Sequence, residues 1–469
     1  MKIFFGTDGW RGILNEEINF ESVALVAQAF ADYLTIKKPH QLKAAVGFDG
    51  RKYSAEFAEL FAEVLSGNGI ETFLSDSVCP TPALSYFVKE NILAAGVMIT
   101  ASHNPAKYNG IKFKADYGGP FLTEETLEVE KLLGRSAIKK NSDLIKRISL
   151  IPPYVEQLEE YIHFKSIREA KLLPCIDSMS GAGQTLLCDL LKKHGCSSKT
   201  IYGEPREDFS GRNAEPIEKN LRPLSEELQS GGYCFGIATD GDADRVGIML
   251  ETGEWLSAQE TILLLSDYLI TKKGLSGHIV KTSSVTDKVK NAFERNGRKV
   301  FDVQVGFKYI CEKMITEEIA FGCEESGGYG YQAHMPERDG ILSALLMLEM
   351  LARSGFSKLS EYAAIKRNEY GIIYYDRIDY TYEKENRIEL LPQLYKNNLR
   401  KIAGFKVTDT AAFLSSRGIV NGLKYYLEGT SRWLLLRASE TEPLVRVYAE
   451  GQSSEEVKQL LNTGISFFS

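Results

Sequence analysis

Apolar and polar positions along the chain follow two periods, one typical of helices and one typical of strands. Helical spacing covers residues 21–34 and 55–65, whereas the short apolar runs 44–48 and 70–74 are typical of strands. The run 92–100 is almost entirely apolar and predicts a strand buried on both faces. Strands that alternate with helices in this way indicate an α/β protein.

The strand and helix rhythm also divides the chain into units. It restarts near residues 171–176 and again near 277–281, which suggests three similar α/β units. A polar stretch at 135–149 predicts a first boundary, and others fall near Glu251 and near Asn368, after which several strands and a closing helix follow. We therefore predict four domains, at residues 1–145, 146–250, 251–367 and 368–469.

One serine, Ser102, follows the strand predicted at 92–100, in the segment Thr100-Ala-Ser-His-Asn-Pro105. The Asn-Pro pair ends regular structure, so the serine lies on a loop at the end of a strand. This position suits covalent chemistry, but the Gly-x-Ser-x-Gly elbow of acyl hydrolases is missing. A turn capped by its own polar side chains would use the same residue types. The segment alone leaves both interpretations open.

Three aspartates, Asp240, Asp242 and Asp244, alternate on a loop directly after the apolar run 233–239. Carboxylate oxygens at alternate positions suit a hard divalent cation such as Mg²⁺. Three carboxylates so close together would repel one another without a cation, which favours a metal site over a solvated acidic turn. An EF-hand does not fit, because Arg245 stands where that loop needs glycine and a strand precedes the loop.

Two further loops carry groups that suit a phosphorylated sugar. In the glycine-flanked segment 322–328, Glu324 can accept hydrogen bonds from hydroxyl groups and Ser326 can donate or accept them. Between two apolar runs near the C-terminus, Arg437 stands close to the hydroxyls of Ser439 and Thr441. An arginine with hydroxyl groups can hold a phosphate monoester, although an ordinary hairpin turn is the alternative.

Composition limits the classes of partner. The net charge of -7 argues against non-specific nucleic-acid binding. Seven scattered cysteines indicate reduced thiols in a cytoplasmic setting. The first apolar run is too short for a signal peptide. The apolar stretch 340–352 is too short for a membrane span and predicts a core helix. We expect a cytoplasmic protein, monomer or homodimer, without membrane or nucleic-acid partners.

The four loops described above carry Ser102, the three aspartates, Glu324 and Arg437. Taken in order along the chain, they resemble those of the alpha-D-phosphohexomutase superfamily, whose members move a phosphoryl group between positions 1 and 6 of a hexose. Segments 5–12 with Arg11, 108–112 with Lys112 and 305–308 with Lys308 extend the resemblance to the whole length. The resemblance implies three similar α/β domains with mixed sheets. A smaller C-terminal α+β domain of the TATA-binding-protein-like type would be hinged against them.

The resemblance also implies a mechanism. Ser102 would carry a phosphoryl group and give it to a hexose phosphate, and the resulting bisphosphorylated sugar would turn end for end. One Mg²⁺ would be held by a phosphoserine oxygen with Asp240, Asp242 and Asp244, and glucose 1,6-bisphosphate would act as activator. Lys112 is the candidate for proton transfer at the sugar hydroxyl, with His103 as the rival. The other implied site residues are Arg11 and Arg245 at the reacting phosphate, and Lys308, Glu324, Ser326, Arg437, Ser439 and Thr441 at the substrate.

The segment Glu324-Glu325-Ser326 resembles the glucose-type loop more than the glucosamine type, so we predict interconversion of glucose 1-phosphate and glucose 6-phosphate. The alternatives are a phosphomannomutase or an enzyme of dual specificity, then a phosphoglucosamine mutase or a sugar bisphosphate synthase. Retention of Ser102 and of all three aspartates argues against a non-catalytic sugar-phosphate-binding protein. Two residues depart from the family pattern: Glu440, expected to face solvent, and Cys323, which stands where glycine is usual and could alter the loop's backbone angles.

Overall fold

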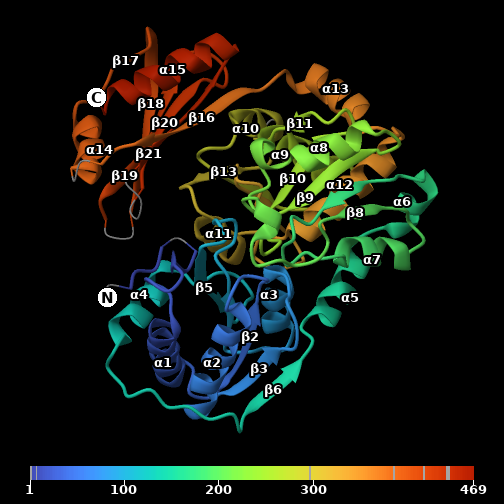
Figure 1. The fold of residues 1–469 in the computed structure, drawn as a ribbon. Helices are drawn as coiled ribbons and strands as arrows, with labels where there is room; N and C mark the ends of the chain where they lie inside the picture. Colours follow the sequence, from blue (N-terminus) through green and yellow to red (C-terminus); the bar gives the residue numbers. More distant parts are fainter. Residues whose placement is uncertain are drawn as a thin grey trace.

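The computed structural model describes residues 3–6, 8–294, 297–383, 386–415, 418–439 and 444–468. Within these residues the chain forms four sheets that follow one another along the sequence, each with its own helices (Figure 1). The first three sheets are mixed, and the fourth is antiparallel throughout. The predicted arrangement of three α/β domains and a C-terminal α+β domain is confirmed.

The first sheet has the strand order β1-β5-β4-β2-β3-β6. Its parallel strands are β2 (Lys43–Phe48), β3 (Glu71–Ser75), β4 (Ala95–Ile99) and β6 (Ile145–Ile148). Its antiparallel strands are β1 (Trp10–Ile13) and β5 (Tyr108–Ala115). Its helices are α1 (Phe20–Lys37), α2 (Ser54–Gly67), α3 (Thr81–Glu90) and α4 (Thr123–Leu132).

The strand predicted at residues 92–100 begins only at Ala95. Ile92 is 75% exposed and has a left-handed φ of 51°, so it belongs to the turn that leaves α3. An apolar side chain in this turn extends the apolar run without extending the strand. From Ala95 to Ile99 every side chain is buried, as predicted.

The second sheet has the order β11-β10-β9-β7-β8. Its strands are β7 (Cys175–Asp177), β8 (Lys199–Ile201) and β9 (Phe235–Thr239), which are parallel, and β10 (Val246–Leu250) and β11 (Trp255–Leu256), which are antiparallel. Its helices are α5 (Ile151–Tyr161), α6 (Phe164–Ala170), α7 (Leu186–Lys193) and α8 (Arg222–Gln229).

The third sheet has the order β13-β12-β14-β15. Its strands are β12 (His278–Thr282), β13 (Val300–Val303) and β14 (Ile319–Cys323), which are parallel, and the antiparallel β15 (Tyr329–Tyr331). Its helices are α9 (Ala258–Asp267), α10 (Asp287–Phe293), α11 (Phe307–Thr316), α12 (Gly340–Ser354) and α13 (Leu359–Tyr370).

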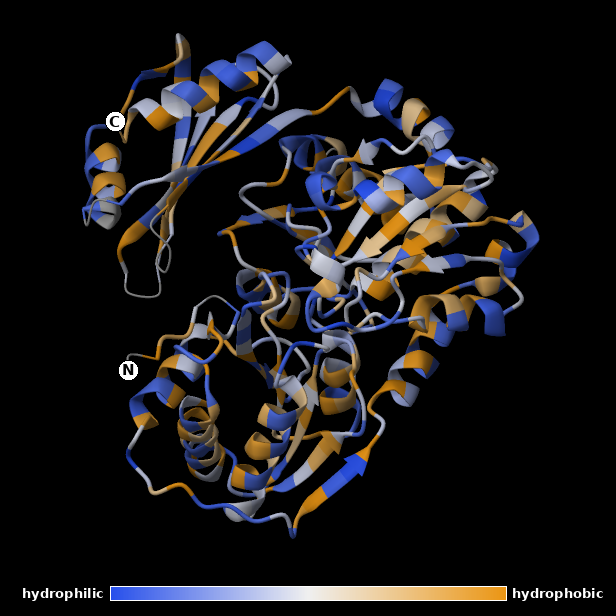
Figure 2. Cartoon of the chain, viewed as in Figure 1, coloured by the Kyte–Doolittle hydropathy of each residue, from blue (hydrophilic) through white to orange (hydrophobic). Residues whose placement is uncertain are grey.

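Helix α12 lies in a core that the second and third domains share. One continuous apolar cluster includes Ile237 of β9, Phe321 of β14 and Leu345 of α12, and Figure 2 shows hydrophobic residues concentrated on these sheets and the helices beside them. The expectation of a core helix is confirmed. Among the described residues, no single helix is long and apolar enough to cross a membrane, whereas α12 and α13 pass that test as a pair bent by 81°.

The sheets also bear on the predicted boundaries. A division after residue 145 would cut β6, which pairs with β3 in the first sheet. A division after residue 250 would separate β11 from the second sheet. The first and second sheets therefore extend a few residues past these two predicted divisions, and the four domain ranges remain a prediction.

The fourth sheet has the order β16-β21-β20-β19-β18-β17. Its strands are β16 (Tyr374–Thr381), β17 (Lys401–Ile402), β18 (Phe405–Leu414), β19 (Val420–Leu427), β20 (Trp433–Ala438) and β21 (Leu444–Gly451). Its helices α14 (Arg387–Lys396) and α15 (Ser454–Ser466) pack on the face that carries Leu434 and Leu436. Trp433 and Leu435 point the other way and pack with Val305 of the third domain.

The three mixed sheets share one feature that positions the site. In each of them a parallel strand is followed by a loop and then by an antiparallel partner: β4 and β5, β9 and β10, β14 and β15. These loops carry Ser102, the three aspartates and Glu324, respectively. The weak internal repeat in the sequence thus corresponds to three equivalent loops.

Candidate active site

Ser102 lies fully buried on the loop after β4 and has a left-handed φ of 51°. Its Oγ donates to Oδ2 of Asp240 at 2.9 Å, and Nδ1 of His103 lies 3.4 Å from the same Oγ. The contact requires close approach of two loops, because a Cβ on Gly241 would lie 2.4 Å from the Ser102 carbonyl oxygen. The predicted nucleophile and the predicted metal loop are therefore side by side.

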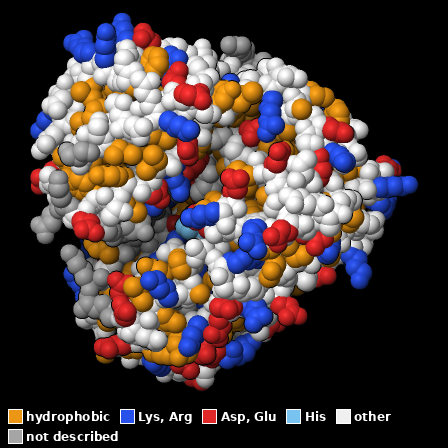
Figure 3. Space-filling view, turned by 45° about the horizontal axis from the view of Figure 1, so that its top comes forward, with side chains coloured by type: hydrophobic (Ala, Val, Ile, Leu, Met, Phe, Trp, Pro, Cys, Tyr) orange, Lys and Arg blue, Asp and Glu red, His pale blue; other side chains and the backbone are white. Residues whose placement is uncertain are grey.

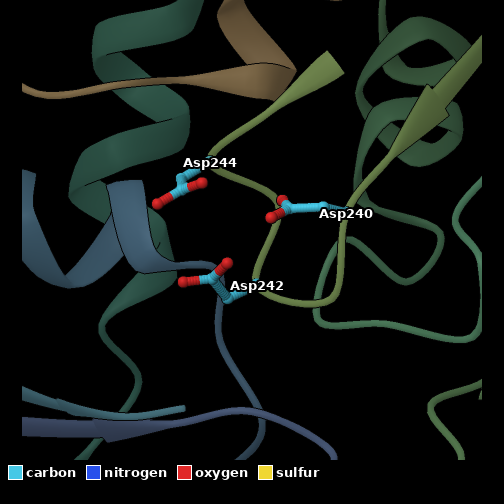
Figure 4. A group of neighbouring side chains, drawn as sticks. All are labelled: Asp240, Asp242 and Asp244. Atoms are coloured by element: carbon cyan, nitrogen blue, oxygen red, sulfur yellow. The ribbon is translucent and has the colours of Figure 1, made fainter. Parts of the chain in front are cut away.

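The three aspartates converge in space as well as in sequence. Their side chains point toward one another from a single loop (Figure 4), and one carboxylate oxygen of each lies within 4.8 Å of the others. All three residues are fully buried. Oδ1 of Asp242 and Oδ1 of Asp244 have no hydrogen-bond partner among the described residues. Buried carboxylate oxygens without partners fit the ligand set of a divalent cation.

Lys112 of β5 reaches this triad from the first domain. Its Nζ lies 2.8 Å from Oδ2 of both Asp242 and Asp244, and 3.2 Å from Oδ2 of Asp8. Burial alone would lower the pKa of Lys112, but the three carboxylates outweigh it and raise that pKa. Thr81 at the start of α3 adds a hydrogen bond of 2.5 Å to Oδ2 of Asp242.

The aspartates differ in acidity because their partners differ. Burial and then the charges of Asp244 and Asp242 raise the pKa of Asp240 well above its usual value. Burial would also raise the pKa of Asp242, but the Lys112 ammonium and the Thr81 hydrogen bond hold it below the usual value. The Lys112 ammonium therefore stabilises the ionised carboxylate of Asp242, whereas Asp240 has less positive charge near it.

Arg11, Arg245 and His103 surround the same point. Nη1 of Arg11 donates to Oδ1 of Asn104 on the Ser102 loop at 2.9 Å. The backbone N–H of Arg245 donates to Oδ1 of Asp240 at 3.1 Å, and its guanidinium Nε lies 3.8 Å from Oδ1 of Asp244. Burial, then Arg245 and Arg11, hold the pKa of His103 well below its usual value, so this imidazole is neutral at pH 7.

The loop after β14 meets the aspartate loop directly. The N–H of Val246 donates to the carbonyl of Gly327 at 3.0 Å, and Arg245 forms an isolated β-bridge with Gly328. Glu324 is buried, and the Ser326 hydroxyl is buried with no hydrogen-bond partner among the described residues. Cys323 ends β14, pairs with Tyr329 and is absent from the left-handed region, so its side chain causes no backbone strain there.

The remaining predicted ligands lie on α11 and in the fourth domain. Nζ of Lys308 donates to Oγ1 of Thr123 at the start of α4, at 2.7 Å. At the end of β20, the Arg437 Nε is buried with no hydrogen-bond partner among the residues that the structure describes. The Ser439 N–H donates to the Leu444 carbonyl at 3.1 Å. Thr441 and Glu440 lie outside the described residues.

Figure 3 shows a hollow near the middle of the molecule with acidic, basic and histidine side chains around it.

Two site residues, Arg338 and Asp8, do not emerge from the sequence patterns. Arg338 is buried just before α12, with Nη2 2.9 Å from Oδ2 of Asp244 and Nη1 3.5 Å from Oε1 of Glu324. It also pairs with Asp8. One guanidinium thus joins loops of three domains. A possible sequence signal is the charged segment 337–339 immediately before an apolar helix.

Comparison with known proteins agrees with this geometry. Domain families described as phosphoglucomutase/phosphomannomutase alpha/beta/alpha domains I, II and III match residues 2–138, 152–253 and 257–370. The C-terminal domain of the same family matches residues 384–463. The chain belongs to the phosphoglucomutase/phosphomannomutase family. Members of this family are mutases, which transfer a phosphoryl group within a molecule, and the protein is an enzyme of this class.

Relatives of this family member span its whole length. The crystal structure of a candidate phosphomannomutase from Thermus thermophilus is 33% identical, covers 99% of both chains and superposes with a TM-score of 0.85. A phosphoglucomutase/phosphomannomutase of Thermococcus kodakarensis is 29% identical over 98% of this chain and 97% of its own. A phosphoglucosamine/phosphogalactosamine mutase of Sulfurisphaera tokodaii is also 29% identical, over 98% of this chain and 97% of its own.

Proposed function

We propose that the protein is a phosphoglucomutase, which interconverts glucose 1-phosphate and glucose 6-phosphate through a phosphoserine at Ser102 and glucose 1,6-bisphosphate. The observation that carries this proposal is the hydrogen bond of 2.9 Å from the Ser102 hydroxyl to Asp240. Phosphoryl transfer needs in-line placement and neutralisation of charge on the phosphoryl oxygens. A phosphate on this hydroxyl would lie between the aspartate triad and the arginines.

Asp240, Asp242 and Asp244 would hold one Mg²⁺, and a phosphoserine oxygen would be a further ligand. The cation would stabilise the negative charge of the transferring group. The unpartnered oxygens of Asp242 and Asp244 support this assignment, since they are available for a ligand. Arg11 and Arg245 add positive charge that is fixed by the protein.

Lys112 is the proposed group for proton transfer at the sugar hydroxyl. Its three carboxylate partners keep it protonated, so it can donate a proton to the sugar oxygen when that oxygen leaves phosphorus and the phosphoryl group returns to Ser102. His103 is the alternative, because it is neutral and its Nδ1 lies 3.4 Å from the Ser102 Oγ. A neutral imidazole is suited to accept a proton.

The substrate would be held by groups from the third and fourth domains. Glu324 and Ser326 would bind sugar hydroxyls, Lys308 would orient the sugar, and Arg437 and Ser439 with Thr441 would bind the distal phosphate. The unpartnered Ser326 hydroxyl and Arg437 Nε support this assignment. The bisphosphate must turn end for end, and movement of the fourth domain would give it room. Glucose 1,6-bisphosphate would activate the enzyme by phosphorylating Ser102.

Mannose 1-phosphate is the second candidate substrate. Glucose and mannose differ at carbon 2 only, whereas Glu324 and Ser326 are proposed to bind hydroxyls that the two sugars share. The name of the Thermococcus relative, which joins both activities, supports dual use.

The test is phosphorylation of Ser102. Intact mass of the purified enzyme after incubation with glucose 1,6-bisphosphate should show one added phosphate, which Ser102→Ala abolishes together with activity. Ser85→Ala is the matched control, because Ser85 is a buried serine whose hydroxyl has no hydrogen-bond partner among the described residues. An active Ser102→Ala enzyme would refute the proposal. Net release of inorganic phosphate would indicate a phosphatase, and accumulation of the bisphosphorylated sugar would indicate a bisphosphate synthase.

A further inference from the structure

The segment from the end of β4 to the first residue of β5, residues 100–108, carries Ser102 and is called the serine loop below. Arg51, on the loop after β2, contacts this loop more extensively than any predicted site residue does. It is 3% exposed. Its two terminal nitrogens donate to four backbone carbonyl oxygens of that loop: Ser102 and Asn104 at 2.6 Å each, and Pro105 and Tyr108 at 3.0 Å each. Its Nε donates to Oδ2 of Asp49 at 3.1 Å. All five N–H donors of the guanidinium are therefore used.

Asp49 extends this network to the other side of Ser102. It accepts hydrogen bonds from Oγ1 of Thr100 at 2.6 Å and from Oγ of Ser54 at 2.7 Å. Thr100 Oγ1 in turn accepts the Ser102 N–H at 2.9 Å. The backbone of Ser102 is thus held at its carbonyl by Arg51 and at its N–H by Thr100.

Ser102 needs such support because its backbone is strained. A left-handed φ costs a residue with a Cβ about 1 kcal/mol or more, so it persists only where neighbouring groups determine it. The same loop conformation directs the Ser102 hydroxyl at Asp240. Loss of the network would let the loop relax and move the hydroxyl away from the triad.

Arg51 also contacts the second domain. Its guanidinium carbon lies 4.6 Å from the centre of the Phe209 ring, and a Cβ on Gly241 would lie 3.3 Å from the same ring. Gly241 stands between two of the triad aspartates. Arg51 therefore lies between the serine loop and a side chain that packs on the aspartate loop.

We propose that Arg51 is a positioning residue for phosphoryl transfer: it fixes the loop that presents the Ser102 hydroxyl to the aspartate triad. This inference rests on the proposed role of Ser102. Lysine cannot replace arginine here, because an ammonium has three donors in a tetrahedral arrangement and the site has five acceptors in a planar one.

The experiment compares Arg51→Lys with the wild-type enzyme. We expect kcat to fall about 10²-fold, as for a displaced reacting group, while KM changes less than about twofold. Transfer of phosphate from glucose 1,6-bisphosphate to Ser102, followed by intact mass, should slow by a similar factor. Hydrogen exchange of amides at residues 100–108 should become faster, with little change elsewhere.

Gln28→Met is the control for a general loss of stability in the first domain. Gln28 is 2% exposed and bonds to Asn68 and Asp32, away from the serine loop. It should lower activity only by the fraction of protein that unfolds. If Arg51→Lys does not fold, Thr100→Val provides the second variant, because it removes the link between Asp49 and the Ser102 N–H and should slow transfer in the same way.

The possible failures are distinguishable. A wild-type enzyme that never acquires phosphate on Ser102 would overturn the proposed function, and the positioning role with it. A wild-type enzyme that is phosphorylated, with folded variants at Arg51 or Thr100 that are phosphorylated at the same rate, would overturn the inference about Arg51 alone.

Discussion

The Lys112 ammonium donates to Oδ2 of Asp242 across 2.8 Å, which places a cation of the first domain at the aspartate triad of the second. The ion pair raises the pKa of Lys112 and keeps that of Asp242 below its usual value. A bound cation would compete with this ammonium for the same carboxylates. Lys112 and Mg²⁺ should therefore influence each other's binding.

Lys112→Met should bind Mg²⁺ about 10-fold more tightly or better, because a repelling charge is lost. Its kcat should fall about 10²-fold to 10⁴-fold, as when a proton-transfer group is lost. Calorimetric titration with Mg²⁺ and steady-state kinetics measure the two effects. The control is Lys114→Met, a buried lysine two positions along the same strand that pairs with Glu337. Unchanged turnover in Lys112→Met would exclude a catalytic role.

Asp242→Asn should lower kcat about 10²-fold or more and change KM little, because the cation acts on charge in the transition state. Kinetics over a range of Mg²⁺ concentrations test this. Asp177→Asn is the control, since Asp177 lies buried on β7 and pairs with Arg212 instead of with the triad. Normal turnover of Asp242→Asn without Mg²⁺ would refute the metal assignment.

Arg338→Gln should lower the free energy of unfolding by about 3 kcal/mol or more, because it removes a buried guanidinium that pairs with the carboxylates of Asp8 and Asp244 and leaves Lys112 as the cation they share. Chemical denaturation measures this loss. Arg353→Gln should cost less than about 1 kcal/mol, since the Arg353 side chain is 40% exposed and lies 3.6 Å from Glu349. Equal losses in the two variants would contradict the structural role of Arg338.

Glucose 1-phosphate should be preferred to mannose 1-phosphate by roughly five- to 150-fold in kcat/KM, the effect of about 1 to 3 kcal/mol for one mismatched hydroxyl. Both sugars are compared at one concentration of glucose 1,6-bisphosphate. Glucosamine 1-phosphate is the third substrate tested. A preference for mannose, or activity on glucosamine 1-phosphate alone, would show that the loop at Glu324 selects differently.

Asp287 lies where the third and fourth domains meet. Its ion pairs should make the free energy of unfolding fall as the pH is lowered into the acid range. Burial would raise its pKa, but Lys281 at 3.0 Å and Lys424 at 3.3 Å lower it to about 2. Since the folded pKa lies below the unfolded value of 3.8, the stabilisation is full above pH 4 and is lost as pH falls toward 2. Asp287→Asn should cost about 2 kcal/mol at pH 6 and about half of that at pH 3, by chemical denaturation. A difference that does not depend on pH would contradict the ion pairs.

The sequence patterns were most informative about loops that follow strands. An apolar run followed by polar residues indicates where β4 and β9 end, and hence where Ser102 and the aspartates lie. The same patterns predict no strand at the short edge strands β6 and β11, because a few residues carry little periodicity. They also extended β4 into the turn at Ile92, since an apolar residue can stand in a turn.

Residue types and their order along the chain determined the four loops, their chemistry and the family to which the chain belongs. Only the tertiary structure decided which charges meet. Asp8 and Arg338 are 330 residues apart in sequence, and Lys114 and Glu337 are 223 apart. Such pairs depend on how the first and third domains pack together, and no local period encodes that packing. The same holds for Arg51, which has an ordinary place in the sequence and acquires four of its five acceptors only when the serine loop folds around it.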